Sequence, residues 1–226
     1  MTQPWPSACA RPICARATRF IFAVHVPVIA LALSPALFQW PMLLLPTQIA
    51  LLQLIIDPAC SVVFEAEPQA ADIMTRAPRP ASATPFEWRH LAPAILQGLA
   101  LATILLLGAW AMQGWDWSGH AAQVRTAVFM TLVPGLFLLV LANRDVSQPL
   151  WASLRLSNRW LWRMALGVLI LLALALGLPW LRRVMGLAVP SPTGLAMVLG
   201  LLSVTLLALE ALRRLDQCSG KGAPAR

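Results

Sequence analysis

The chain has 226 residues, of which 59% are hydrophobic and only 12% are charged. An ordinary soluble domain is far less apolar than this, so the composition indicates that lipid is the solvent for most of the chain. The formal net charge of +8 does not indicate nucleic-acid binding, because the Lys and Arg residues lie in short gaps between long apolar runs. We interpret them as topology signals of a membrane protein.

Six stretches approach or exceed the roughly 20 apolar residues that a membrane-spanning helix needs. They are residues 19–38, 41–64, 91–112, 124–142, 160–181 and 193–212. The sequence therefore predicts an all-α fold, a polytopic membrane helix bundle with six transmembrane helices. The first two stretches are joined by a tight turn around Trp40, which makes their helices antiparallel neighbours.

The basic residues predict which side of the membrane each connection faces. Arg and Lys gather in the N-terminal segment 1–17, in the polar loops 65–90 and 143–159 and in the tail 215–226. With six spans these four segments lie on one side, and the opposite side holds few basic residues. By the positive-inside rule, both loops, the tail and both termini are predicted to be cytoplasmic.

A resident metal or a disulfide framework is not expected. The four cysteines form no CxxC pair and have no His at metal-ligand spacing. The basic start before an apolar run superficially imitates a signal peptide, but the run is too long and has no small-residue cleavage pattern, so a retained membrane helix is predicted.

Asp57 is the one acidic residue placed well inside a predicted span, and an ionisable residue at that depth usually faces the interior of a bundle or an ion path. Gln53 lies one helical turn before it on the same face. Pro58 follows directly, lacks a backbone N–H and is expected to break the helix and free carbonyls for a ligand. Such oxygens suit a hard cation. The alternative is a protonated Asp57 that holds helices together.

His25 marks a similar irregularity in the first predicted span. It stands two residues before Pro27, which is the second expected helix break. A lone His in an apolar helix is more often a satisfied interior residue than a ligand, but this His belongs to the helix that pairs with the Asp57 helix. We therefore include it among the ion-binding candidates.

The first third of the chain resembles the fifth and sixth membrane helices and the following loop of P-type ATPases of the calcium-pump-like branch. The resemblance rests on four motifs, which are, in chain order, HVP, LLPTQ, IIDP and DIMTRAPRP. The later spans agree in number and length, so residues 18–214 resemble the C-terminal transmembrane domain, from the fifth to the tenth helix, and residues 1–17 stay unmatched. The bacterial members of that branch have very similar sequences, and the resemblance therefore implies a bacterial inner membrane.

This resemblance implies roles for the candidate residues. Asp57 corresponds to the central cation ligand of the sixth helix, Gln53 to an Asn or Glu one turn earlier, and His25 to a fifth-helix ligand Asn. Three further ligand positions carry apolar residues here, namely Val28, Ile56 and, roughly, Leu136. With one acidic ligand, a monovalent ion, a proton or a single cation is easier to accommodate than two divalent cations.

The sequence contains no DKTGT, TGD or GDGxNDxP motif. The chain is therefore not expected to be an enzyme on its own, and no cofactor is expected in it, because ATP and Mg²⁺ would bind domains on a separate polypeptide. One hypothesis is an ion-translocation segment that works with such a partner. The other is a degenerate pump remnant or a membrane scaffold without transport activity.

A stand-alone membrane enzyme is not favoured, since His25, His90 and His120 lie on different segments without a nucleophile or a metal-ligand pattern.

Overall fold

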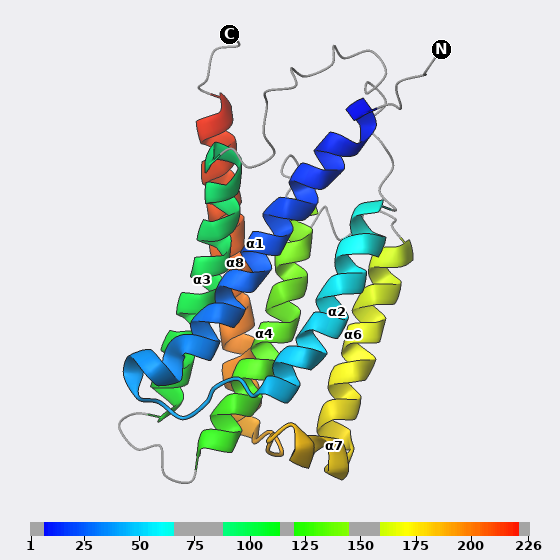
Figure 1. The fold of residues 1–226 in the computed structure, drawn as a ribbon. Coiled ribbons are helices and arrows are strands. Elements are labelled where there is room, and N and C mark those ends of the chain that lie inside the picture. The colour runs from blue at the N-terminus through cyan, green and yellow to red at the C-terminus, as the bar shows by residue number, and fades with distance from the viewer. Residues whose placement is uncertain (1–6, 66–87, 114–119, 145–158, 222–226) are drawn as a thin grey trace.

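A computed structural model describes residues 7–65, 88–113, 120–144 and 159–221, and this part of the chain is all-helical, as predicted. The helices are α1 (Ser7–Phe38), α2 (Pro46–Glu65), α3 (Trp88–Gln113), α4 (Ala121–Arg144), α6 (Arg159–Gly177), α7 (Pro179–Val184) and α8 (Pro192–Lys221). The long helices run side by side as a bundle (Figure 1).

Four helices in the described part are long and apolar enough to cross a membrane. These candidate spans are Thr18–Phe38, Leu91–Met112, Ala121–Asn143 and Pro192–Asp216. They confirm four of the six predicted spans. The apolar part of α6, Trp162–Gly177, is shorter than a usual span. Helix α2 has 20 residues, a length of about 30 Å at the α-helical rise, which is close to the hydrocarbon thickness.

The turn between α1 and α2 is longer than the sequence predicted. Residues 41–45 are not part of a helix, and α2 begins at Pro46 instead of at residue 41. Proline is favoured at the first helical position because its missing N–H would be unsatisfied there in any case. The side-chain oxygen of Gln48 accepts the N–H of Leu45 at 3.0 Å, which caps the start of the helix.

The predicted helix 160–181 is broken into α6 and α7. Leu178 between them has extended backbone angles, φ −83° and ψ 116°. The cause is Pro179, because a proline disfavours the helical conformation of the residue before it. At the other end of the chain, α8 continues as helix to Lys221, so the first residues of the predicted tail 215–226 are helical.

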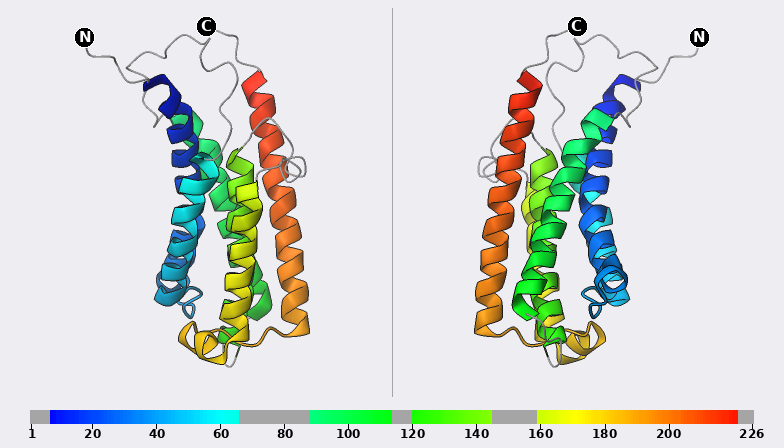
Figure 2. Two further views of the ribbon diagram at one scale, coloured as in Figure 1. Left: turned by 90° about the vertical axis from the view of Figure 1, so that its right-hand side faces the viewer. Right: turned by 90° about the vertical axis from the view of Figure 1, so that its left-hand side faces the viewer.

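The start of α1 and the end of α8 lie at the same end of the bundle, together with the end of α2 and the start of α3 (Figure 1). The α1–α2 turn and the segment from α7 to α8 lie at the opposite end, and the side views agree (Figure 2). This grouping matches the predicted division of the connections between two sides. Most of the predicted loops 65–90 and 143–159 lies outside the described residues.

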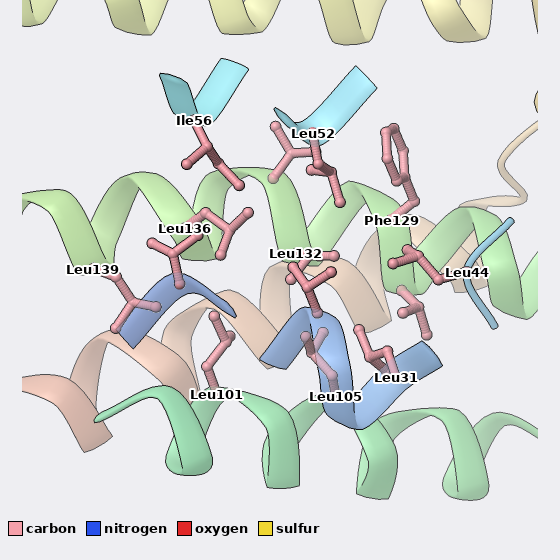
Figure 3. Close-up of a cluster of buried hydrophobic side chains, with 14 of the residues drawn as sticks. Leu31, Leu44, Leu52, Ile56, Leu101, Leu105, Phe129, Leu132, Leu136 and Leu139 are labelled. Carbon is pink, nitrogen blue, oxygen red and sulfur yellow. The ribbon is translucent and has the colours of Figure 1, made fainter. Parts of the chain in front are cut away.

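Helix α4 is the centre of the bundle. Of its most apolar stretch 72% is buried, against 17% for α8. Leucine side chains of α1, α2 and α3 point toward those of α4 and form one hydrophobic cluster (Figure 3). Helix α1 packs mainly on α3, whereas α2 lies between α1 and α6.

Helices α1 and α3 approach closely at Gly98. A Cβ atom on this residue would overlap the carbonyl oxygen of Ala23, and it would lie 3.0 Å from the Cβ of Val26. Small residues at helix contacts let backbones approach in membranes, where packing drives association.

We predict that Gly98→Ala lowers the free energy of unfolding by about 1 to 3 kcal/mol, because the added methyl meets backbone rather than a flexible side chain. The measurement is the midpoint of SDS-induced unfolding in mixed micelles, followed by tryptophan fluorescence. Gly200→Ala is the matched control, since a Cβ there meets nothing within 4 Å. Equal effects of the two changes would contradict the close contact.

Candidate functional site

Gln53 and Asp57 lie on α2, beside the face that packs into the core. The core face is formed by Leu52 and Ile56, which are 1% and 4% exposed and point toward α4 (Figure 3). Gln53 follows Leu52 and is half-buried. Asp57 stands one turn after Gln53 in the described helix, as predicted, while its side chain and that of Pro58 lie outside the described part. The Gln53 side chain thus lies at the edge of the hydrophobic cluster.

His25 lies on α1 and is half-buried. Its Nδ1–H donates to the carbonyl oxygen of Ile21 over 2.8 Å. This bond is local and leaves Nε2 as the ring nitrogen with a lone pair. A His that binds a cation commonly donates its other N–H to a backbone carbonyl in this way, so the geometry suits a ligand as well as an interior residue.

The expected helix breaks at Pro27 and Pro58 are not present. Helices α1 and α2 continue as α-helix through both residues. A proline removes one backbone donor, and a helix packed in a bundle can continue past that single loss. The prediction of unwound carbonyls was therefore wrong.

Pro27 acts on helix packing instead. Because it has no N–H, the carbonyl of Ala23 four residues earlier has no helical donor. That oxygen is the atom closest to the place of a Cβ on Gly98. The carbonyl of Ala23 thus faces the backbone of α3, where a weak Cα–H···O contact can form.

The three apolar residues that the resemblance implies at ligand positions lie in one hydrophobic cluster. Val28, Ile56 and Leu136 are 7%, 4% and 5% exposed. Ile56 and Leu136 face each other across the α2–α4 contact (Figure 3). Hydrocarbon therefore occupies all three of these positions.

A polar clamp, formed by Gln48, Arg125 and Thr126, joins the connecting segments at the end of the bundle opposite the termini. Arg125 donates from Nε to the carbonyl of Met42 over 2.9 Å and from Nη1 to that of Gly186 over 3.0 Å. Gln48 donates to the carbonyl of Met185 over 2.9 Å. The clamp fixes the start of α2. It therefore also fixes the position of Gln53 and Asp57 along the membrane normal.

Thr126 completes the clamp. Its hydroxyl donates to Ala122 within α4 over 2.7 Å and accepts the N–H of Ala188 over 2.8 Å. From the sequence alone, Arg125 was only a marker of membrane side, and Thr126 had no functional role. A charged residue directly before a hydroxyl residue in an apolar span was the signal that could have identified both.

A second polar pair, also missed, joins α3 and α4 near the end of the bundle that holds the termini. The Nδ2 of Asn143 donates to the Oε1 of Gln97 over 2.9 Å and to the carbonyl of Leu139 over 3.0 Å. Both amide residues are 3% exposed. The pair is an interhelical contact of the kind that orients membrane helices.

We predict that Arg125→Met destabilises the protein by about 1 to 3 kcal/mol, because two carbonyls lose a charged donor. Urea-induced unfolding in detergent measures this loss. Arg183→Met is the control, because Arg183 is exposed and donates weakly, over 3.3 Å, within its own helix; we expect a change below about 0.5 kcal/mol. The clamp would be refuted if the two variants unfolded alike.

Comparison with known proteins identifies the family. No curated protein matches the chain. One family profile, described as cation transporting ATPase, C-terminus, matches residues 41–215. The matched region contains α2 with Gln53 and Asp57, and it leaves α1 with His25 outside. Since the match covers well over half of the chain, this protein belongs to the family of C-terminal membrane domains of cation-transporting ATPases.

Proposed function

We propose that this chain is the ion-translocating membrane part of a P-type cation pump of the calcium-pump-like branch. The observation that carries the proposal is the family match over α2, the helix on which Asp57 lies within the apolar sequence. In this proposal a separate polypeptide supplies the domains that bind ATP and Mg²⁺ and undergo phosphorylation.

The proposed ion site lies at the edge of the hydrophobic cluster. Its ligands are the Asp57 carboxylate and the Gln53 amide oxygen. His25 adds Nε2 from α1, a helix that contacts α2. One carboxylate balances one positive charge, so the site takes a monovalent cation, a proton or a single cation.

The buried hydrocarbon of Val28, Ile56 and Leu136 supports a site for one ion instead of two. A dehydrated cation against aliphatic side chains would have no oxygen to replace its water, which is prohibitively costly. The apolar cluster therefore forms a wall of the proposed site and closes the volume in which a second ion could lie.

We further propose that the end holding both termini faces the cytoplasm of a bacterial cell and that the chain lies in the inner membrane. The support is the basic residues Arg19, Arg213 and Arg214 at this end of α1 and α8. At the other end, Arg125 is taken up by backbone carbonyls within the chain.

A membrane scaffold without transport activity is the second candidate. It is favoured by the same buried cluster, because hydrocarbon at three ligand positions is what a bundle would acquire when it no longer binds a cation. In that case Asp57 is protonated and serves in helix packing.

The two candidates differ in the effect of Asp57→Asn. If the chain translocates ions, the change lowers ATP-driven cation uptake roughly tenfold or more, because the cation loses its one counter-charge. The measurement is uptake of Na⁺, K⁺ and Ca²⁺, and of protons by a dye, into inside-out vesicles that contain this chain and the ATPase domains of a pump of the same branch.

Ser203→Ala is the control for this experiment, since Ser203 is an exposed residue that donates only to Leu199 within α8 over 2.8 Å. Uptake is expected to persist in this variant. Absence of ATP-driven uptake with every cation in the wild-type pair, or equal uptake by the Asp57→Asn variant, would refute the translocation proposal and support the scaffold.

A further inference from the structure

Helix α6 is shorter than the hydrocarbon layer of a bilayer. Its apolar part, Trp162–Gly177, is about 24 Å long at the α-helical rise, whereas the hydrocarbon is about 30 Å thick. The charge of Arg163 keeps the start of α6 at one interface. At Leu178 the extended backbone turns the chain away from α6, and α7 lies at the end of the bundle where α4 and α8 begin (Figure 1, Figure 2). Helix α7 therefore lies at the other edge of the hydrocarbon.

Helix α7 packs on the bundle with one side and presents an apolar pair on the next. Leu181 packs against the hydrophobic cluster, and Met185, directly after the helix, is 5% exposed. Trp180 and Val184 are also one helical turn apart, and they are 66% and 46% exposed. The bundle thus fixes α7 in place while an aromatic and an aliphatic side chain point outward from it.

The two arginines of α7 have different surroundings. Arg182 is half-buried and donates to the carbonyl of Leu176, at the end of α6, over 3.4 Å. Arg183 is exposed, and its Nε donates weakly to the carbonyl of Pro179 in its own helix, over 3.3 Å. The exposed guanidinium of Arg183 is therefore accessible to a ligand.

No carboxylate in the described part of this end of the bundle balances that charge. Asp and Glu are absent from the described residues that form it, namely 38–50, 108–113, 120–127 and 177–194. Within these residues Arg125 is bound by backbone carbonyls, and Arg182 donates to the end of α6. The outward charge of α7 is thus positive and suits a negatively charged surface.

A lipid surface fits this combination better than a second copy of the chain does. Trp is favoured at the membrane–water interface because its ring is apolar and its N–H is polar. Helices that lie in the interface bury their apolar face by about 5 to 10 Å, and α6 is about 6 Å shorter than the hydrocarbon is thick. A symmetric contact between two copies would instead bring like charges of Arg183 together.

We propose that α7 is an interfacial helix that docks this end of the bundle onto anionic phospholipid. Trp180 and Val184 enter the boundary between headgroups and acyl chains, and the guanidinium of Arg183 donates to a lipid phosphate, whose oxygens match its planar fork. The segment after α7 supplies the carbonyls of Met185 and Gly186 to the polar clamp. The lipid contact therefore also steadies the clamp.

The first experiment measures the depth of α7. The full chain, with its native cysteines replaced, carries an NBD fluorophore at Val184→Cys and is reconstituted into vesicles of phosphatidylglycerol and phosphatidylcholine. Quenching is compared between lipids with a nitroxide near the headgroup and lipids with a nitroxide near the chain end. We expect stronger quenching by the shallow nitroxide. Leu169→Cys is the matched control, because Leu169 is 62% exposed in the middle of α6 and is expected to respond most to the deep nitroxide.

The second experiment measures the lipid preference at the same label. The shallow nitroxide is placed on phosphatidylglycerol or on phosphatidylcholine, and the ratio of the two quenching efficiencies gives the local enrichment of the anionic lipid. Arg183→Gln is expected to lower this enrichment about fivefold, the factor that one basic side chain near an anionic surface contributes. Arg182→Gln is the charge-matched control, and we expect a smaller fall because Arg182 is half-buried and engaged with α6.

Shallow quenching at residue 184 together with a selective fall in Arg183→Gln supports the proposal. Quenching at residue 184 that matches the pattern of residue 169 overturns it, since α7 would then continue the span. Absence of quenching by either lipid overturns it in favour of water or protein at this face, and disulfide formation between unlabelled Val184→Cys copies would identify a second copy. Equal falls in Arg182→Gln and Arg183→Gln, or none, overturn the phosphate contact of Arg183.

Discussion

The structure depends on one constraint, which is that a polar group within the bilayer must find its partner inside the protein. The polar clamp meets this constraint at one end of the bundle: Arg125 binds the carbonyls of two connecting segments that are distant in sequence. The Nδ2 of Asn143 and the Oε1 of Gln97 meet it near the other end, through a bond between α3 and α4. Between these two levels the helices contact mostly through aliphatic side chains. The clamp also sets where α2 begins, so the candidate ion ligands depend on it for their position along the membrane normal.

Proline and glycine meet the same constraint through the backbone. The carbonyl of Ala23, which Pro27 deprives of its helical donor, is covered by the close approach of α3 at Gly98. A proline in a membrane helix can thus serve packing as well as ion binding, and the choice depends on what faces the carbonyl. Around Val28 and Ile56 the bundle is filled with hydrocarbon. The proposed ion site is therefore limited to the side of α2 that carries Gln53. This site is small and has one counter-charge.

Length and hydropathy were sufficient to predict the broad architecture. The apolar runs predicted the all-helical fold and four of the six spans. The basic residues in the connections between these runs predicted that the start of α1 and the end of α8 lie at one end of the bundle. The helix start at Pro46 and the helix break before Pro179 were missed, because a hydropathy pattern does not distinguish a proline that starts or interrupts a helix from one that the helix continues through, such as Pro27. The clamp could not be predicted, since it joins Arg125 to carbonyls, and backbone carbonyls have no sequence pattern. The sequence predicted a helix through Gln53 and Asp57, and α2 contains both residues.

The central claim is that the face of α2 with Gln53 and Asp57 is open to an ion while the neighbouring face with Leu52 is dry. Cysteine accessibility tests it most directly. In a background in which the four native cysteines are replaced, Gln53→Cys and Leu52→Cys are compared for their rate of modification by a water-soluble thiosulfonate, with and without Na⁺, K⁺ and Ca²⁺. The account predicts that Gln53→Cys reacts, that one of the cations slows it, and that Leu52→Cys does not react. Equal protection of both positions under every condition would contradict it.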